Sequence, residues 1–125
     1  MSQNFAAPWK IVPPLDLLEK NPQLKSLASQ LSLKFVHRQP VAEEDLKIVG
    51  STLWENLGID DEFQKAWEQA GSRILPLVIS TEDPSLLTLP WECLYHPQHG
   101  FLGENLKFTL SRQSKILSRL LSLFS

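Results

Sequence analysis

The chain has one cysteine and no long uninterrupted apolar run among its 125 residues. A single cysteine excludes an intramolecular disulfide and a cysteine-based metal cluster, and it fits a reducing compartment. No apolar run approaches the roughly 20 residues that a membrane-spanning helix needs. The first seven residues do not lead from a basic segment into an apolar one, so we expect no secretory signal. We therefore expect a cytoplasmic protein.

Charge is unevenly distributed along the chain. Residues 1–105 carry eight basic and fourteen acidic side chains, a net charge of −6, whereas residues 106–125 carry four basic side chains and no acidic one. The acidic main body argues against nucleic-acid binding, because nucleic-acid-binding proteins present basic surfaces to phosphates. The length suits one domain, and 42% hydrophobic residues is ordinary for a globular chain.

Apolar residues at helical spacing predict three helices. Asn21 and Pro22 are typical of a helix start, and Asp60 is expected to cap a later helix. Gly58 follows the second apolar stripe, where a helix commonly ends. The expected helices span 22–31, 40–57 and 61–70, with a single helical turn at 14–19.

Short apolar and alternating runs predict strands. The run 73–80 is almost continuously apolar and β-branched, which is typical of a strand covered on both faces. Pro76 removes one ladder donor, so we expect this strand to be an edge there or to contain a bulge. The other expected strands span 33–38, 101–102 and 106–112, with a loop at 81–88 and an irregular arm at 1–12.

The stretch 89–97 has a pattern of its own. Pro90 suits the first turn of a helix because it lacks an N–H, and Glu92 follows where the helix dipole favours negative charge. Trp91 shares one face with the apolar residues at i+3 and i+4. Such a short helix is unstable alone, so we expect Trp91 to anchor it in the core.

Several motifs occur in the order found in the CHAT domain, and the chain resembles this family from about residue 46 to 112. The CHAT domain is a caspase-like domain of bacterial proteins, related to clan CD cysteine peptidases. Cys93 stands where the family usually has Leu, and His96 where it often has Asp. The residues that carry the resemblance are Leu53, Trp54, Glu55, Leu89, Pro90, Trp91, Glu92, Leu94, Tyr95, Pro97, Gly100, Phe101, Leu102 and Arg112.

The resemblance implies an α/β, partial caspase-like fold, with N-terminal helices, short strands forming part of a sheet, and a C-terminal amphipathic helix. It also implies that the catalytic His and Cys of the family lie downstream of the matched region, so no catalytic residue is assigned here. We divide the chain into an arm and helix (1–40), the N-terminal part of a CHAT-like domain (41–112) and a basic amphipathic helix (113–125).

Cys93 with His96 or His99 is the one combination in this chain that suggests catalysis. A nucleophilic thiol needs a nearby base and an oxyanion site, whereas a free cysteine mostly packs in the interior, and we favour packing. No histidine spacing matches a zinc motif, so no metal or other cofactor is expected. Trp54, Trp67 and Trp91 are expected to pack in the core.

Three roles are open for the segment 113–125: docking on this domain, forming a seam to a missing half, a partner or a second copy, or lying on an anionic membrane surface. A sheet built only from these strands has an unpaired edge, which invites association. We expect a non-catalytic, truncated CHAT-domain protein that acts as an interaction or regulatory module, through a protein partner or self-association. The alternative is half of a split cysteine peptidase whose His/Cys dyad another chain supplies.

Overall fold

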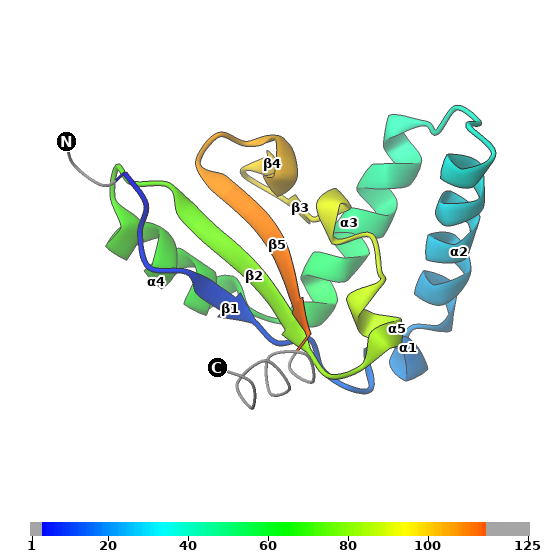
Figure 1. The fold of residues 1–125 in the computed structure, drawn as a ribbon, viewed down its shortest axis with the longest axis horizontal. Helices are drawn as coiled ribbons and strands as arrows, with labels where there is room; N and C mark the ends of the chain where they lie inside the picture. The colour runs from blue at the N-terminus through cyan, green and yellow to red at the C-terminus, as the bar shows by residue number, and fades with distance from the viewer. Residues whose placement is uncertain (1–3, 115–125) are drawn as a thin grey trace, which may run out of the picture.

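The computed structural model describes residues 4–114 as an α/β unit built on a small parallel sheet (Figure 1). The sheet has the order β1-β2-β5, and a separate two-stranded hairpin joins β3 to β4. Helix α4 runs behind β1 and β2, whereas α2 and α3 form an antiparallel pair beyond β5 (Figure 1). In chain order the elements are β1 (Trp9–Ile11), α1 (Leu17–Lys20), α2 (Pro22–Val36), α3 (Glu43–Leu57), α4 (Asp60–Ala70), β2 (Leu75–Thr81), α5 (Pro84–Leu87), the 3₁₀ turn η1 (Trp91–Cys93), β3 (Tyr95–His96), β4 (Gly100–Phe101), the 3₁₀ turn η2 (Leu102–Glu104) and β5 (Phe108–Ser114).

Strand β2 is the centre of the sheet, and the arm expected to be irregular supplies one of its neighbours, β1. Strand β1 pairs in parallel with β2 only from Trp9↔Leu77 onward. Of the two alternatives predicted at Pro76, an edge or a bulge, the structure has a bulge-like interruption of the pairing with the arm. An isolated bridge joins Phe5 to Ile74, so three residues of the arm lie opposite two of β2 before regular pairing begins. Pro76 falls in this interruption, where its missing N–H leaves no ladder bond unmade.

The predicted helix at 22–31 is confirmed but continues to Val36, and the predicted strand at 33–38 is wrong. The last turn of α2 and its C-cap at His37 occupy that run instead. The apolar side chains of this run were expected to pack as part of a strand, but they are largely exposed. The exposed fraction is 59% for Leu33, 56% for Phe35 and 76% for Val36. The buried stripe of this helix is the earlier one, formed by Leu24, Ala28 and Leu31.

Helices α3 and α4 confirm the predicted helical pair and adjust its boundaries. Helix α3 begins at Glu43 rather than near residue 40, and it ends at Gly58, which adopts the left-handed conformation (φ 61°). Asp60 is the first residue of α4 and not its cap. Its carboxylate instead accepts a hydrogen bond from Nε1 of Trp54 at 2.8 Å, which ties the two helices together across their short link.

The connection from β2 to the Trp91 turn is more ordered than the loop predicted at 81–88. Asp83 accepts a hydrogen bond from the backbone N–H of Ser85 at 2.9 Å and caps the single helical turn α5. Strand β5 begins at Phe108, and Leu106, expected inside the strand, is 92% exposed ahead of it. The strand extends through Ser114, so the helix predicted at 113–125 is wrong at its first two residues, and the rest of it lies outside the described residues.

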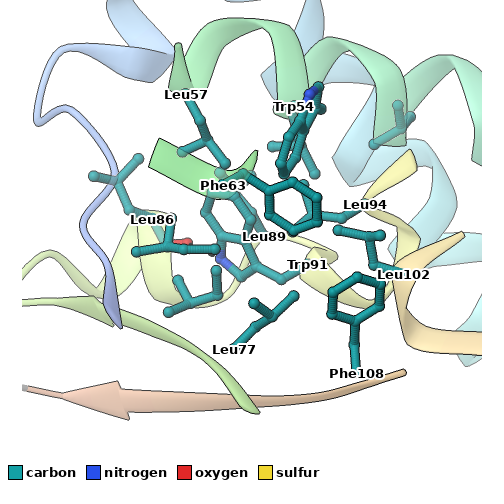
Figure 2. Packing of buried hydrophobic residues seen from close by; sticks show 14 of the residues in the cluster. Trp54, Leu57, Phe63, Leu77, Leu86, Leu89, Trp91, Leu94, Leu102 and Phe108 are labelled. Carbon is teal, nitrogen blue, oxygen red and sulfur yellow. Dashed lines mark hydrogen bonds between the residues drawn. The ribbon is translucent and has the colours of Figure 1, made fainter. Parts of the chain in front are cut away.

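One hydrophobic core joins the sheet to the helices and turns (Figure 2). Trp91 lies at its centre, with Phe63 of α4, Leu77 of β2 and Phe108 of β5 around it (Figure 2). Trp54 and Trp91 are buried as predicted, whereas Trp67 is half-buried. Within residues 4–114 there is no helix with the length and hydrophobicity to cross a bilayer.

Candidate functional site

The stretch 89–97 is held by several hydrogen bonds and by the buried ring of Trp91, although its helix is shorter than predicted. Only Trp91–Cys93 are helical, as one 3₁₀ turn, and Tyr95 belongs to β3 rather than to the turn. The side chain of Trp91 is fully buried, and its Nε1–H donates to the carbonyl oxygen of Leu86 at 2.8 Å. Trp91 therefore anchors the turn in the core, as the sequence predicted.

Arg112 of β5 connects the sheet to this turn. Its guanidinium forms a two-pronged ion pair with the carboxylate of Glu92, in which Nη2 lies 2.7 Å from Oε2. The same side chain donates to the carbonyl oxygens of Leu87 and Leu89, each at 2.9 Å. Partial burial of Glu92 by itself raises the pKa of its carboxyl group. The hydrogen bonds from Arg112 outweigh this effect and hold the pKa of Glu92 below its ordinary value. Arg112 thus satisfies two carbonyls and one carboxylate that belong to a different part of the chain.

Two glycines let the backbone of the turn approach its neighbours. A Cβ on Gly50 of α3 would overlap the carbonyl oxygen of Cys93 and lie 2.7 Å from its carbonyl carbon. A Cβ on Gly103 of η2 would lie 3.0 Å from the carbonyl oxygen of Glu92. The turn is therefore packed between α3 and η2, with no space for a side chain at Gly50 and a tight contact at Gly103.

The hairpin after the turn brings the remaining motif residues together. The backbone N–H of Leu102 donates to the carbonyl of Leu94 at 3.0 Å, and both side chains are fully buried. Tyr95 pairs with Phe101, and their rings meet edge to face with centroids 4.9 Å apart. Gly100 adopts a positive φ of 73° where the hairpin turns back.

Some motif residues stand apart from these contacts. Leu53 and Trp54 are buried on α3, but Glu55 is exposed on the same helix. Pro97 is exposed in the hairpin turn, and Pro90 is half-buried at the start of the 3₁₀ turn. The motif is therefore a packing unit with exposed members and not a ring of side chains around a cavity.

The Cys93 thiol is poorly suited to nucleophilic attack. The residue is only 8% exposed. Burial, followed by the negative charge of Glu92, raises the pKa of Cys93 above its ordinary value. A thiolate is the reactive form, and a raised pKa makes it scarce at neutral pH.

The histidines near Cys93 are used in packing and hydrogen bonding. His96 is 7% exposed, and its Nδ1 accepts hydrogen bonds from the backbone N–H groups of Gln98 and His99. His99 stacks on Trp67 with centroids 4.3 Å apart. His37 lies far along the chain, exposed at the end of α2.

No metal centre or enclosed cavity gathers these groups. Within residues 4–114, no three His, Cys, Asp or Glu side chains lie close enough together to hold a metal ion. A surface groove of ≈ 470 Å³ lies between α2 and the α5 segment, with Leu33, Val36 and Leu89 among its lining residues. Its lining includes Lys25 and several hydroxyl side chains but no cysteine, histidine or carboxylate, so the groove does not contain the thiol or the imidazoles discussed above.

Sequence reasoning named Glu92 and Arg112 as motif residues but did not pair them, because twenty residues separate them and they lie on different elements, the 3₁₀ turn η1 and strand β5. It also passed over Gly50, although a glycine inside a predicted helix is itself a signal of close backbone contact. The acceptor role of His96 carries no sequence signature.

Comparison with known proteins adds nothing to this description, since no protein-family model, curated protein or solved structure matches the chain.

Proposed function

We propose that this chain is a non-catalytic interaction module with a CHAT-like, partial caspase-like fold. The order of the motifs from Leu53 to Arg112 supports the resemblance, and their contacts around the Trp91 turn are compatible with a shared structural role. The parallel sheet flanked by helices is the class of fold that the resemblance implies.

The observation that carries the non-catalytic part of the proposal is the state of Cys93. The thiol is buried with a raised pKa, while Nδ1 of His96 is occupied by two backbone donors. A cysteine peptidase needs an accessible thiolate beside a free base. The chemistry-bearing groups of this region are therefore better explained as parts of the core.

The interaction part of the proposal rests on the two edges of the sheet. Strand β1 has only three residues, and Pro8 and Lys10 protect it in the ways that edge strands are usually protected. Strand β5 has seven residues without proline, and within residues 4–114 no strand pairs with its outer side. Although η2 and α5 contact this strand, a long edge without a strand partner is a template for another strand.

The direction of the backbone groups on β5 shows which residues such a strand would meet. The N–H of Leu75 donates to the carbonyl of Lys107 at 2.8 Å. The backbone carbonyl of Lys107 therefore points toward β2. Because the backbone groups of alternate residues point to opposite sides of a strand, those of Leu110 and Arg112 point away from β2. We take a second copy as the partner, since an antiparallel β5 centred on Ser111 sets Leu110 opposite Arg112 and avoids facing like charges.

Sedimentation velocity over a range of concentrations tests this association. We expect the unaltered chain to dimerise and Leu110→Pro to abolish the dimer, because proline removes an outward N–H that β2 does not use. Leu110→Ala is the matched control, since it removes the same side chain but keeps the N–H. A chain that stays monomeric, or equal loss of the dimer in both variants, contradicts the proposed edge.

A peptidase assay tests the absence of catalysis separately. We expect no cleavage of fluorogenic peptides by the purified chain. Cleavage that Cys93→Ala abolishes would overturn the proposal, and cleavage that appears only with a second chain would instead favour a split peptidase.

A further inference from the structure

One imidazole accepts two backbone hydrogen bonds within the turn that joins β3 to β4. Between the strands the chain turns through Pro97, Gln98 and His99. Nδ1 of His96 accepts hydrogen bonds from the backbone N–H groups of Gln98 at 3.0 Å and of His99 at 3.3 Å. A ring nitrogen that accepts hydrogen bonds carries no proton. The closed turn therefore requires a neutral His96 with its proton on Nε2.

Aromatic rings surround this imidazole. The ring centroid of His96 lies 4.9 Å from that of Trp54 and 5.0 Å from that of Phe63, two rings that meet on one side of the core (Figure 2). The imidazole of His99 lies 4.6 Å from that of His96. Within the described part of the chain, the buried Nε2 of His99 has no hydrogen-bond partner. Two imidazoles this close in apolar surroundings resist becoming charged together.

Three charged side chains from other segments contact aromatic rings that lie beside the two histidines in space or in sequence. Asp60 of α4 bonds to the indole of Trp54, and its negative charge favours a protonated His96. Ahead of β5, Lys107 holds its ammonium 5.0 Å from the ring of Trp67, on which His99 stacks. On α3, Lys47 holds its ammonium 4.9 Å from the ring of Tyr95 in the hairpin. Of these groups, Asp60 is the one that acts on the pKa of His96, which it raises.

We infer that the β3–β4 hairpin is a pH-sensitive latch, held closed by neutral His96 and opened when His96 takes up a second proton. A proton on Nδ1 removes the acceptor for both backbone N–H groups. The new Nδ1–H then points at the N–H groups of Gln98 and His99, which are also donors. Opening frees His99 from Trp67 and uncovers the aromatic rings beneath the turn. This inference does not depend on the proposed interaction function.

The direction of the pH dependence follows from the environment of the ring. Burial, followed by the charge of His99, lowers the pKa of His96, and Asp60 only partly opposes this. The open hairpin returns the imidazole to its ordinary pKa of about 6.5 and so binds the proton more tightly than the closed one. The closed hairpin is fully favoured above about pH 6.5 and loses stability as the pH falls below that value.

Residue-resolved hydrogen exchange of the Gln98 and His99 amides tests the latch, after correction for the intrinsic pH dependence of exchange. Linkage of one proton to opening limits the effect to about tenfold per pH unit. We expect the protection of both amides to be constant above about pH 7. Below about pH 6.5 it should decrease as the pH falls, by up to about tenfold per pH unit.

Two variants make the test specific. In His96→Asn the amide oxygen provides an acceptor near the Nδ1 position but does not titrate, so protection should stay constant across this range. His37→Asn removes an exposed histidine outside the hairpin and should leave the fall in protection unchanged. An equal fall in His96→Asn and the unaltered protein overturns the inference.

A second measurement keeps the inference testable if His96→Asn does not fold. The ¹⁵N shifts of the imidazole in the unaltered protein report its tautomer and its charge. We expect a neutral ring with the proton on Nε2 at neutral pH. A doubly protonated His96 at neutral pH, or a proton on Nδ1, would contradict the latch.

Discussion

At the scale of single residues, the Trp91 turn is fixed by close contact rather than by any one strong bond. Trp91 contributes a buried ring and one hydrogen bond to Leu86. Gly50 contributes only the absence of a side chain, which lets α3 touch the backbone of Cys93. Interiors are packed too densely to accept an added methyl group without displacement.

Gly50→Ala should therefore destabilise the protein. An alanine inside a helix normally gains up to about 1 kcal/mol over glycine, but here the methyl group overlaps the Cys93 carbonyl. We expect a net loss of at least about 2 kcal/mol in the free energy of unfolding, measured by urea denaturation. Ser51→Ala, at the next position of α3, is the control and should change stability little. A stabilised Gly50→Ala variant would show that α3 and the turn are not in contact.

The Cys93 thiol should react slowly in the folded protein. It is nearly buried, and its raised pKa leaves little thiolate at neutral pH. We expect labelling by a thiol-specific reagent to be at least about tenfold slower in buffer than in denaturant. Similar rates in both conditions would mean that the thiol is open to solvent.

At the scale of secondary structure, the end of α2 shows why a local pattern was misread. Arg38 adopts a positive φ of 55°, and the N–H groups of Arg38 and Gln39 donate to the carbonyls of Phe35 and Lys34. These two bonds form the Schellman motif that ends a helix, usually with glycine at the left-handed position. With arginine there, and with apolar residues just before it, the stop signal was absent and the run looked like a strand.

Arg38→Gly should stabilise the protein. The left-handed conformation costs a residue with a Cβ about 1–2 kcal/mol, and glycine avoids this cost while losing more chain entropy on folding. We expect a net gain of about 0.5–1 kcal/mol in the free energy of unfolding, followed by thermal and urea denaturation. Gln39→Gly, one residue further, is the control and should give no gain. Loss of stability in Arg38→Gly would contradict the left-handed conformation.

Whether the other elements could be predicted depends on how close together in the sequence the residues that determine them lie. The apolar stripes of α3 and α4 and the left-handed Gly58 lie within a few residues, so the sequence predicted these helices well. Strand β1 consists of three residues whose partner lies more than sixty positions away. No local pattern distinguishes such a strand from an extended arm. For the same reason the pairing of Glu92 with Arg112 could not be predicted from the sequence.

At the scale of the whole molecule, Arg112 of β5 is a polar link between the sheet and the chain that leads from α5 into the Trp91 turn. Its guanidinium binds Glu92 and the carbonyls of Leu87 and Leu89. The aromatic cluster around His96 links α3, α4 and the hairpin in a second place. Since one link contains a carboxylate and the other an imidazole, acid should weaken them in separate pH ranges.

The Glu92–Arg112 link should make global stability fall in strong acid. Arg112 lowers the pKa of Glu92 in the folded state, so the unfolded chain, with a carboxyl pKa of about 4.3, binds the proton more tightly. The contribution is present above about pH 4.3 and is lost as the pH falls through the lower folded value. Because the pair is partly exposed to solvent, its loss should amount to no more than about 1 kcal/mol.

Urea denaturation across this range should show a smaller acid dependence in Glu92→Gln than in the unaltered protein. Glu55→Gln, which removes an exposed carboxylate of α3, is the control. An unchanged acid dependence in Glu92→Gln would mean that Arg112 stabilises the fold through the carbonyls of Leu87 and Leu89 alone.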